Sequence, residues 1–384
     1  TFKELLVDME LRNLQNNIVG QEASRLFARA EINMGVEAFR DSLYSLLKRN
    51  TFLNIKFENM LDTLGEISRT DIRSLLGEWE KTTPLPFYSL GEPTLTKITN
   101  KGGEEFFVLK MLISNNSDYD GIIHMDIRKD GWWYQPLEDP RAKTKIEMPA
   151  HTSKEFVSVW EDQIRNVEIN TMVSGNLPNI ISQDINNVKQ ERNKIVKDSI
   201  YILPESSFDL PGEIIVDNED STLFILSAPP IVGLLPKWLD EVEETPFKYS
   251  GISWWRPPLQ WTATTNDRYY GKYIRSAFVI KSGDGSQTAT WKVPVPEVGQ
   301  YDLYYHVFKD DELRWNNNLQ GEYHFKVKYG SEVEDAYVNL RKANEGWEQL
   351  GSYYFDSDTV RVVLTDECKL RSVTADAVKI VKRY

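Results

Sequence analysis

The sequence predicts a multidomain α+β protein. Apolar residues recur at helical spacing in the first part of the chain, whereas apolar and polar residues alternate in most of the rest. At 384 residues the chain is long enough for two to four domains. We expect a helical subdomain (1–86), a small antiparallel β-sandwich (87–175), a short α/β connecting region (176–249) and a C-terminal antiparallel β-sandwich of jelly-roll type (250–384).

Three apolar stripes predict the helices of the first part. Residues three and four apart share one helix face. The stripes are Phe39/Leu43/Leu46/Leu47, Phe57/Met60/Leu61/Leu64 and Ile72/Leu75/Leu76/Trp79. Pro84 and Pro86 then end the helical run, because proline lacks the amide hydrogen that a helix needs.

Alternation with a period of two predicts the strands of the small sandwich. The alternating sets are Phe107/Leu109/Met111/Ile113, Ile123/Met125/Ile127 and Val157/Val159. Such a period places each apolar set on one face of a half-buried sheet. Trp132, Trp133 and Tyr134 follow a Lys-Asp-Gly turn and are expected to be packing residues.

The connecting region gives the weakest pattern. Residues 188–199 are polar with mixed charge, and we expect a short helix there, with a linker as the alternative. Residues 214–216 and 223–226 are apolar, and the Asp-Asn-Glu-Asp stretch at 217–220 between them predicts a hairpin turn. Calcium binding by these four side chains is an alternative to a solvated turn, but the twelve-residue loop spacing is absent.

The last third of the chain has the clearest strand pattern. Its alternating sets are Tyr301/Leu303/Tyr305/Val307, Tyr323/Phe325/Val327/Tyr329 and Val360/Val362/Leu364. Turn residues separate nearly every run, which favours an antiparallel sandwich. Trp347 between two glycines is expected to fill the core, and Asp376 to be a structural acid held by backbone amides.

Composition excludes several classes of protein. The formal net charge is −13, so the chain is a poor candidate for wrapping nucleic acid. Cys368 is the only cysteine, so an intrachain disulfide is impossible. No apolar run of about 18 residues predicts a membrane span, and no leader sequence is recognisable. The chain starts at Thr1 in mid-pattern, and we interpret it as a piece of a longer protein.

Four motifs in the last third resemble the golvesin carboxy-terminal-type domain. They are Trp-Lys-Val-Pro at 291–294, Gly-Gln-Tyr-Asp-Leu-Tyr-Tyr at 299–305, Gly-Trp-Glu-Gln-Leu-Gly at 346–351 and Ala-Asp-Ala-Val at 375–378. The resemblance covers roughly residues 250–384. It implies a carbohydrate-binding-like β-sandwich at the end of an exported bacterial protein, without catalytic activity of its own.

The first part carries a second resemblance. The stretches at 35–43, 57–61 and 75–79 look like the end of an aminopeptidase N-type zinc peptidase (gluzincin) domain, which is followed by a small β-sandwich in that family. The match covers about residues 15–175. The zinc motif His-Glu-x-x-His is missing, because His124, His151, His306 and His324 are all isolated in the sequence.

Aromatic residues near position 260 are the candidate ligand-binding site. Exposed Trp and Tyr rings stack on sugar rings or bind cations. The candidates are Trp254, Trp255, Trp261, Tyr269, Tyr270 and, in a separate polar loop, Trp315. The alternative is that these rings seal a domain junction by burying apolar surface.

The sequence contains no recognisable catalytic site, metal site or cofactor motif. Asp310, Asp311 and Glu312 are adjacent acids, but adjacency does not establish the separation that glycoside hydrolysis needs. Acidic neighbours should raise the pKa of Cys368 and reduce its reactivity.

We therefore expect a non-catalytic, ligand-binding and scaffolding fragment of an exported, peptidase-like bacterial protein, periplasmic or at the cell surface. Its expected partners are a glycan or a protein, and the upstream part of the same polypeptide. The alternatives are a purely structural module, or part of an active zinc aminopeptidase whose catalytic residues lie upstream.

Overall fold

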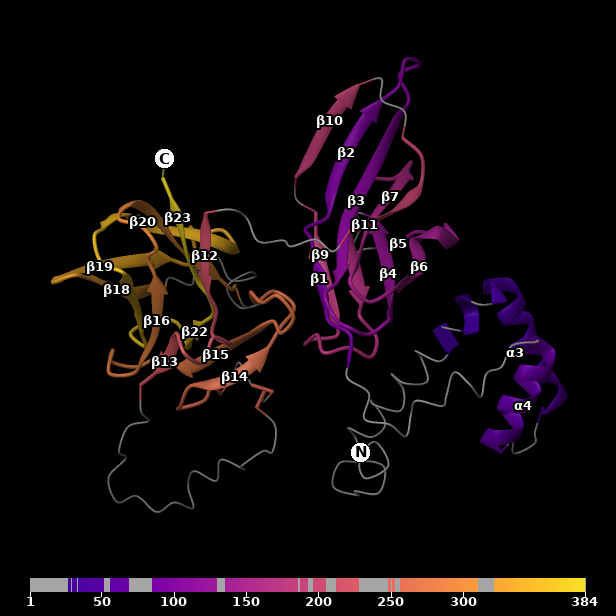
Figure 1. Cartoon of the computed structure of the whole chain (residues 1–384), viewed down its shortest axis with the longest axis horizontal. Coiled ribbons are helices and arrows are strands. Elements are labelled where there is room, and N and C mark those ends of the chain that lie inside the picture. The colour runs from indigo at the N-terminus through magenta and orange to yellow at the C-terminus, as the bar shows by residue number, and fades with distance from the viewer. Residues whose placement is uncertain are drawn as a thin grey trace. The chain divides into compact units, whose positions relative to one another are not determined.

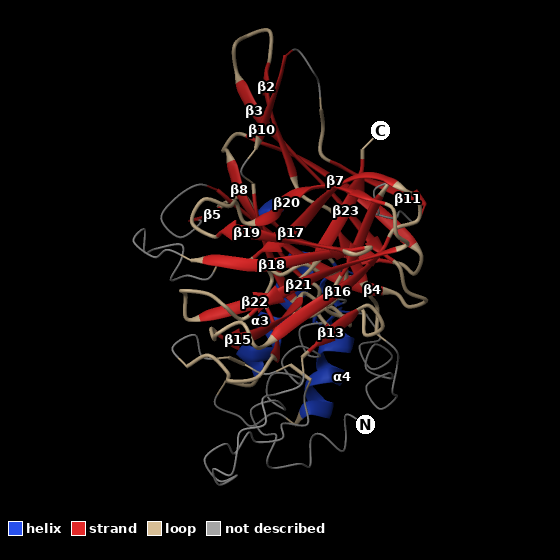
Figure 2. Cartoon of the chain, turned by 90° about the vertical axis from the view of Figure 1, so that its left-hand side faces the viewer, coloured by secondary structure: helices blue, strands red, loops and turns tan. Residues whose placement is uncertain are grey.

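The structure is a computed structural model, and it consists mostly of strands (Figures 1 and 2). It describes residues 27–28, 30–32, 34–51, 56–68, 85–129, 135–185, 187–192, 196–204, 212–227, 248–249, 251–252, 256–309 and 321–383. Contacts divide the chain into two units, Thr1–Ser207 and Phe208–Tyr384. Within the described ranges, no helix is long and apolar enough to cross a membrane.

The first unit contains the helices α3 (Val36–Arg49) and α4 (Phe57–Ser68), and residues 27–28, 30–32 and 34 before them are also helical. Leu46 of α3 packs against Leu61 and Leu64 of α4, so the first two predicted stripes contact each other. Leu47 is an exception, because it faces outward with 57% of its surface exposed. The third predicted stripe lies outside the described residues.

Two sheets follow in the first unit. The first has the order β10-β2-β3-β7-β11 with β1 also paired to β3, and the second has the order β5-β4-β8-β9 with β6 also paired to β4. A short 3₁₀ helix, η2 (Pro140–Ala142), precedes β6. The strands are β1 (Tyr88–Leu90), β2 (Thr94–Thr99), β3 (Glu105–Asn115), β4 (Gly121–Lys129), β5 (Gln135–Pro136), β6 (Lys143–Met148), β7 (Thr152–Trp160), β8 (Ile164–Asn170), β9 (Ile180–Asp184), β10 (Val188–Arg192) and β11 (Ser199–Pro204).

The predicted alternation in β3 and β4 is confirmed. All seven residues of these two sets are buried in one core. Val157 and Val159 of β7 belong instead to a separate small cluster with Ile98, Val108 and Val196. Both sheet faces of β7 therefore carry apolar side chains, because Phe156 and Trp160 point into the main core.

The expected helix at residues 188–199 is wrong. Residues 188–192 form β10, which pairs in parallel with β2, and β11 begins at Ser199 and pairs with β7. Both are edge strands of the first sheet. Residues 189–192 are exposed, so this edge strand lacks the apolar alternation that marks a half-buried one.

The second unit contains two larger antiparallel sheets, which share one core, and a smaller third sheet. Their orders are β12-β23-β17-β20, β13-β16-β21-β18-β19 and β14-β15-β22. The strands are β12 (Glu213–Val216), β13 (Phe224–Leu226), β14 (Thr262–Thr265), β15 (Ser276–Lys281), β16 (Thr288–Pro294), β17 (Gly299–Val307), β18 (Glu322–Tyr329), β19 (Glu332–Asn339), β20 (Gly346–Phe355), β21 (Thr359–Thr365), β22 (Ser372–Ala375) and β23 (Val378–Lys382).

The three alternating sets of the last third supply the core of this sandwich. Their residues are buried except Tyr329, which packs against the core from its edge. Trp291 lies at the centre with no exposed surface, and its Nε1 donates to the Asp376 carbonyl oxygen at 3.1 Å. The predicted antiparallel sheets are therefore present, and they share this core.

The predicted hairpin at residues 214–226 is wrong, although both of its strands exist. β12 pairs with β23 in one sheet, whereas β13 pairs with β16 in the facing sheet. The turn at 217–220 carries the chain from one sheet to the other. Two apolar runs joined by a polar turn resemble a hairpin in sequence, but their pairing partners lie more than 60 residues away.

Truncation of the core ring of Phe325 should destabilise the second unit strongly. Phe325 is fully buried and packs 4.9 Å from the Tyr305 ring. We expect Phe325→Ala to lower the free energy of unfolding by about 3–5 kcal/mol, measured by urea unfolding followed through tryptophan fluorescence. Tyr354→Ala, at a ring that is 59% exposed, should change it by less than about 0.5 kcal/mol. Equal effects of the two changes would contradict this packing.

Candidate functional site

The candidate site lies on the outer face of the sheet β12-β23-β17-β20. Along β17, Tyr301, Leu303 and Tyr305 point into the core, whereas Tyr304 and His306 point outward. Register places Tyr304 opposite Lys379 of β23 and His306 opposite Trp347 of β20. We call the outward group of Tyr270, Tyr304, His306, Trp347 and Lys379 the His306 face.

A register shift in β20 brings Trp347 to this face. Leu303 pairs with Gly351, but the next residue, Tyr304, pairs with Gln349, so Leu350 is an extra residue. Strict alternation from the buried Phe355 would point Trp347 into the core. The β-bulge reverses the alternation and turns it outward. The prediction that Trp347 fills the core is therefore wrong, and Trp347 is half-buried.

The aromatic rings of the His306 face contact one another. The Tyr270 ring lies 5.1 Å from Trp347 and 5.8 Å from His306, and His306 meets Trp347 edge-on at 5.1 Å. The Lys379 ammonium lies 4.9 Å from the Trp347 ring and 5.3 Å from the Tyr304 ring. It also pairs with Glu213 of β12 at 2.9 Å. These contacts fix a half-exposed aromatic surface with a cation at its centre.

A buried carboxylate holds the face from below. Asp376 has no exposed surface, and its Oδ2 lies 2.8 Å from Nδ1 of His306. Both carboxylate oxygens also accept the Tyr270 backbone amide at 3.2 Å. Burial raises the pKa of the Asp376 carboxyl, whereas His306 opposes this rise. The expected structural role of Asp376 is confirmed for the backbone amide, and the sequence did not reveal its contact with His306.

The charges around this face occur in pairs. Asp302 accepts from Arg383 Nε at 2.8 Å, from Gln349 at 3.0 Å and from Ser352 at 2.5 Å. Lys379 is paired with Glu213, and His306 with Asp376. The surface therefore offers fixed hydrogen-bonding groups without a large excess of one charge.

Three of the six residues predicted to bind a ligand, Trp261, Tyr269 and Tyr270, lie within the described residues, and these three do not share one exposed surface. Trp254, Trp255 and Trp315 lie outside the described residues. Tyr269 is buried and packs against Phe308 at 4.6 Å, so it is not an exposed platform. Trp261 is half-buried against the sandwich core. Tyr270 alone among the described candidates joins the His306 face.

The acidic turn at 217–220 is only partly exposed to solvent. Asn218 is buried and contacts Ser276, and Glu219 contacts Ser276, Lys248 and Tyr249. Burial and repulsion by Asp376 raise the pKa of Asp217 well above its ordinary value. Within the described ranges, no group of three or more His, Cys, Asp or Glu side chains is arranged to hold a metal ion.

A second polar cluster lies on the opposite sheet. The His324 ring stacks on Tyr337 at 4.8 Å and lies between Asp335 at 2.7 Å and Glu367 at 3.2 Å. A cavity of about 310 Å³ lies beside this cluster, and Cys368 lines it together with His324, Tyr337 and Glu367. The pKa of the Cys368 thiol is raised, as expected, but the main cause is burial rather than the acidic neighbours. The adjacent acids at 310–312 lie outside the described residues.

Sequence comparison identifies the family of the C-terminal part. Residues 257–382 match the Golvesin C-terminal domain, which confirms that resemblance over about a third of the chain. No curated protein sequence matches the chain. The aminopeptidase resemblance gains no support from these comparisons.

Comparison with solved structures finds distant likenesses. A Bacteroides uniformis beta-glucuronidase has 12% identity and a TM-score of 0.22, and the alignment covers 83% of this chain and 32% of that chain. A calcium-binding mutant of Bacteroides uniformis beta-glucuronidase 2 has 11% identity, a TM-score of 0.21 and coverages of 82% and 32%. Murine APRIL has 13% identity, a TM-score of 0.17 and coverages of 33% and 95%.

The chain thus spans about a third of the length of these beta-glucuronidase chains. At such low TM-scores, the likenesses carry no argument about its fold or activity.

The raised pKa of Asp217 predicts a pH-dependent stability. The folded state holds this proton more tightly than the unfolded state, whose carboxyl has its ordinary pKa of 3.8. Protonated Asp217 therefore contributes to the stability of the folded state below pH 3.8. This contribution is lost as the pH rises through the pKa that Asp217 has in the folded state. Asp217→Asn removes the buried charge, so it should stabilise the second unit at pH 7 by roughly 1 kcal/mol and by less at pH 4.

Thermal unfolding at the two pH values measures this difference. The control is Asp356→Asn, at an exposed carboxylate in the same unit. An equal effect of Asp217→Asn at both pH values would show that its carboxyl has the same pKa in both states.

Proposed function

We propose that the chain is a non-catalytic binding and scaffolding region of a larger exported, peptidase-like bacterial protein. In this proposal the C-terminal sandwich binds a glycan on its His306 face. The observation that carries it is the surface formed by Trp347, Tyr270 and Tyr304 around Lys379 and His306. Aromatic faces take up the C–H-rich side of a sugar ring, and adjacent polar groups bind its hydroxyls.

The paired charges favour a neutral glycan. A strongly anionic ligand would need cations that are free of internal partners, but Lys379 and Arg383 both have carboxylate partners. Paired side chains can still share hydrogen bonds with hydroxyl groups, because each retains donor or acceptor capacity. The match to the Golvesin C-terminal domain supports an accessory role beside other domains.

The peptidase-like character of the whole protein belongs to the same proposal. Its support is the order of a helical segment followed by a sandwich, together with the sequence resemblance described above. The chain itself has no His-Glu-x-x-His motif, so an aminopeptidase site would need residues from outside it. A periplasmic or cell-surface location is the setting in which this combination would act.

A structural or assembly role is the second candidate. Tyr269 is buried and Trp261 packs on the core, so part of the aromatic segment serves the fold itself. This role predicts no glycan binding at the His306 face.

Titration of the full chain with neutral and acidic polysaccharides tests the proposal. We expect a neutral glycan to bind. Trp347→Ala or Tyr270→Ala should lower the affinity about tenfold, which corresponds to about 1.4 kcal/mol of binding free energy. His306→Ala should lower the affinity less, because it removes one polar contact. The measurement is isothermal titration calorimetry, with circular dichroism to verify the fold.

Tyr337→Ala is the matched control, because Tyr337 is an exposed aromatic residue (59%) of β19 in the opposite sheet. It should leave binding unchanged. Failure of every polysaccharide to bind would favour the structural role, and loss of binding in Tyr337→Ala alone would move the site to the other sheet. Hydrolysis of aminoacyl or glycoside substrates by the chain would refute the non-catalytic part.

A further inference from the structure

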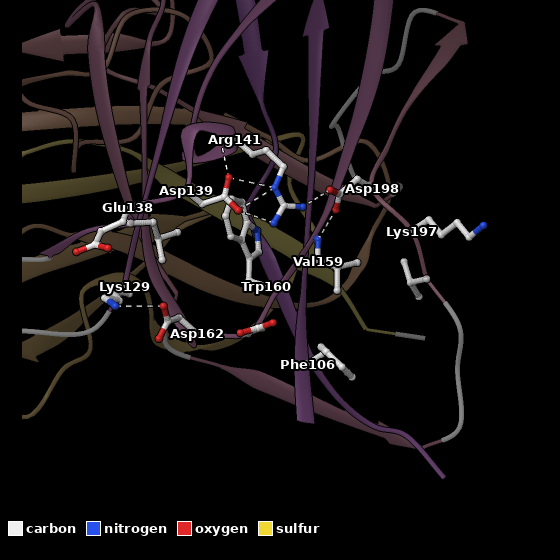
Figure 3. A pocket seen from close by; sticks show the side chains of 13 residues that line it. Phe106, Lys129, Glu138, Asp139, Arg141, Val159, Trp160, Asp162, Lys197 and Asp198 are labelled. Atoms are coloured by element: carbon white, nitrogen blue, oxygen red, sulfur yellow. Dashed lines mark hydrogen bonds and ion pairs between the residues drawn. The ribbon is translucent and has the colours of Figure 1, made fainter. Parts of the chain in front are cut away.

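The first unit contains a cavity that is independent of the His306 face. It has a volume of about 580 Å³ and lies beside the ends of β4 and β7 and the segment before β11 (Figure 3). Sites for small molecules typically enclose roughly 300–1,000 Å³. The cavity therefore has room for a small ligand or for one or two side chains of a peptide.

One wall of the cavity is held rigidly by charged groups. Arg141 lies over the Trp160 ring at 5.0 Å and between the carboxylates of Asp139 and Asp198 (Figure 3). Its Nε donates to Asp139 at 2.9 Å, and Asp198 also accepts the Val159 amide at 2.7 Å. The Arg141 guanidinium is thus shared by two carboxylates and is a poor receptor for an additional anion.

The remaining charges make the cavity acidic. Five carboxylates and three cationic side chains line it, a net charge of −2. Lys129 is paired with Asp162 at 3.1 Å, and the Lys197 side chain points away from the other lining groups (Figure 3). Among the described residues, Glu138 and Glu161 have no ion-pair partner and are exposed. Their negative potential favours a cation.

Part of the cavity lining is apolar. Phe106, Val159 and Val196 are half-buried lining residues, and the two valines continue into the small apolar cluster on this side of the first sheet. An aliphatic chain could cover these side chains while its charged end stays near water, as lysine and arginine side chains do on protein surfaces.

We propose that this cavity binds an organic cation with a short alkyl stem, either an ammonium or a guanidinium group. The stem lies against Phe106, Val159 and Val196, and the cationic head lies near Glu138 and Glu161. Two sources share this chemistry, a free diamine and a lysine or arginine side chain of a peptide. The rigid pairing of Arg141 keeps the wall in place before the ligand arrives.

Calorimetric titration of the full chain at low salt with cadaverine and with acetyl-lysine-amide tests the proposal. The double change Glu138→Gln/Glu161→Gln keeps the side-chain shape and should weaken binding about five- to tenfold. The matched control is Glu37→Gln/Glu66→Gln, which removes the same charge from exposed positions of α3 and α4. It should leave binding unchanged, and added salt should weaken binding to the unmodified chain.

The outcomes separate the two sources and can overturn the proposal. Tighter binding of cadaverine identifies a free diamine, and tighter binding of the lysine derivative identifies a peptide side chain. The proposal is wrong if neither cation binds, if both double variants bind equally, or if galacturonate binds in preference to the cations. None of these outcomes depends on glycan binding by the second unit.

Discussion

The fully buried carboxylate of Asp376 is the constraint on which the second unit depends most. An unpaired charge at this depth would cost several kcal/mol, so the groups that satisfy it must stay in place. From the surface side these groups are His306 and the Tyr270 amide. From the core side, the Trp291 indole binds the Asp376 carbonyl. Asp376 therefore couples the packed interior, through its backbone carbonyl, to the outer aromatic rings, through its carboxylate.

The second sandwich is larger than its family match. The match begins at residue 257, but β12 pairs with β23 and β13 pairs with β16, and both of these strands precede it. The turn between them also brings Asp217 close enough to Asp376 for their repulsion to raise the pKa of Asp217. The two strands thus complete the two facing sheets and place Glu213 beside Lys379 of the His306 face.

The two candidate sites differ in how their charges are used. Lys379 and His306 of the His306 face and Arg383 beside it each have a carboxylate partner, which suits a ligand rich in hydroxyl groups. In the cavity of the first unit, the single guanidinium is shared by two carboxylates while Glu138 and Glu161 remain available. Binding at the first site should therefore depend little on ionic strength, in contrast to binding at the second.

The sequence by itself determined the strands with strong alternation and the two helical stripes that the structure describes. Side chains of β3, β4, β17, β18 and β21 are buried where the period of two places them, because that period is a local property of extended backbone. The local pattern also identified the C-terminal family through four short motifs.

Only the tertiary structure decided which strands pair and which side chains meet. The polar sequence of β10 predicted a helix, but the segment is a strand because it pairs with β2. The two strands of the predicted hairpin at 214–226 belong to two facing sheets. One extra residue, Leu350, reverses the direction of Trp347, and no local pattern marks its position. Likewise His306 and Asp376 are 70 residues apart, so their contact depends on the pairing of β17 with β23. Pairing between distant segments is a property of the whole fold, and for this reason the candidate sites emerged only from it.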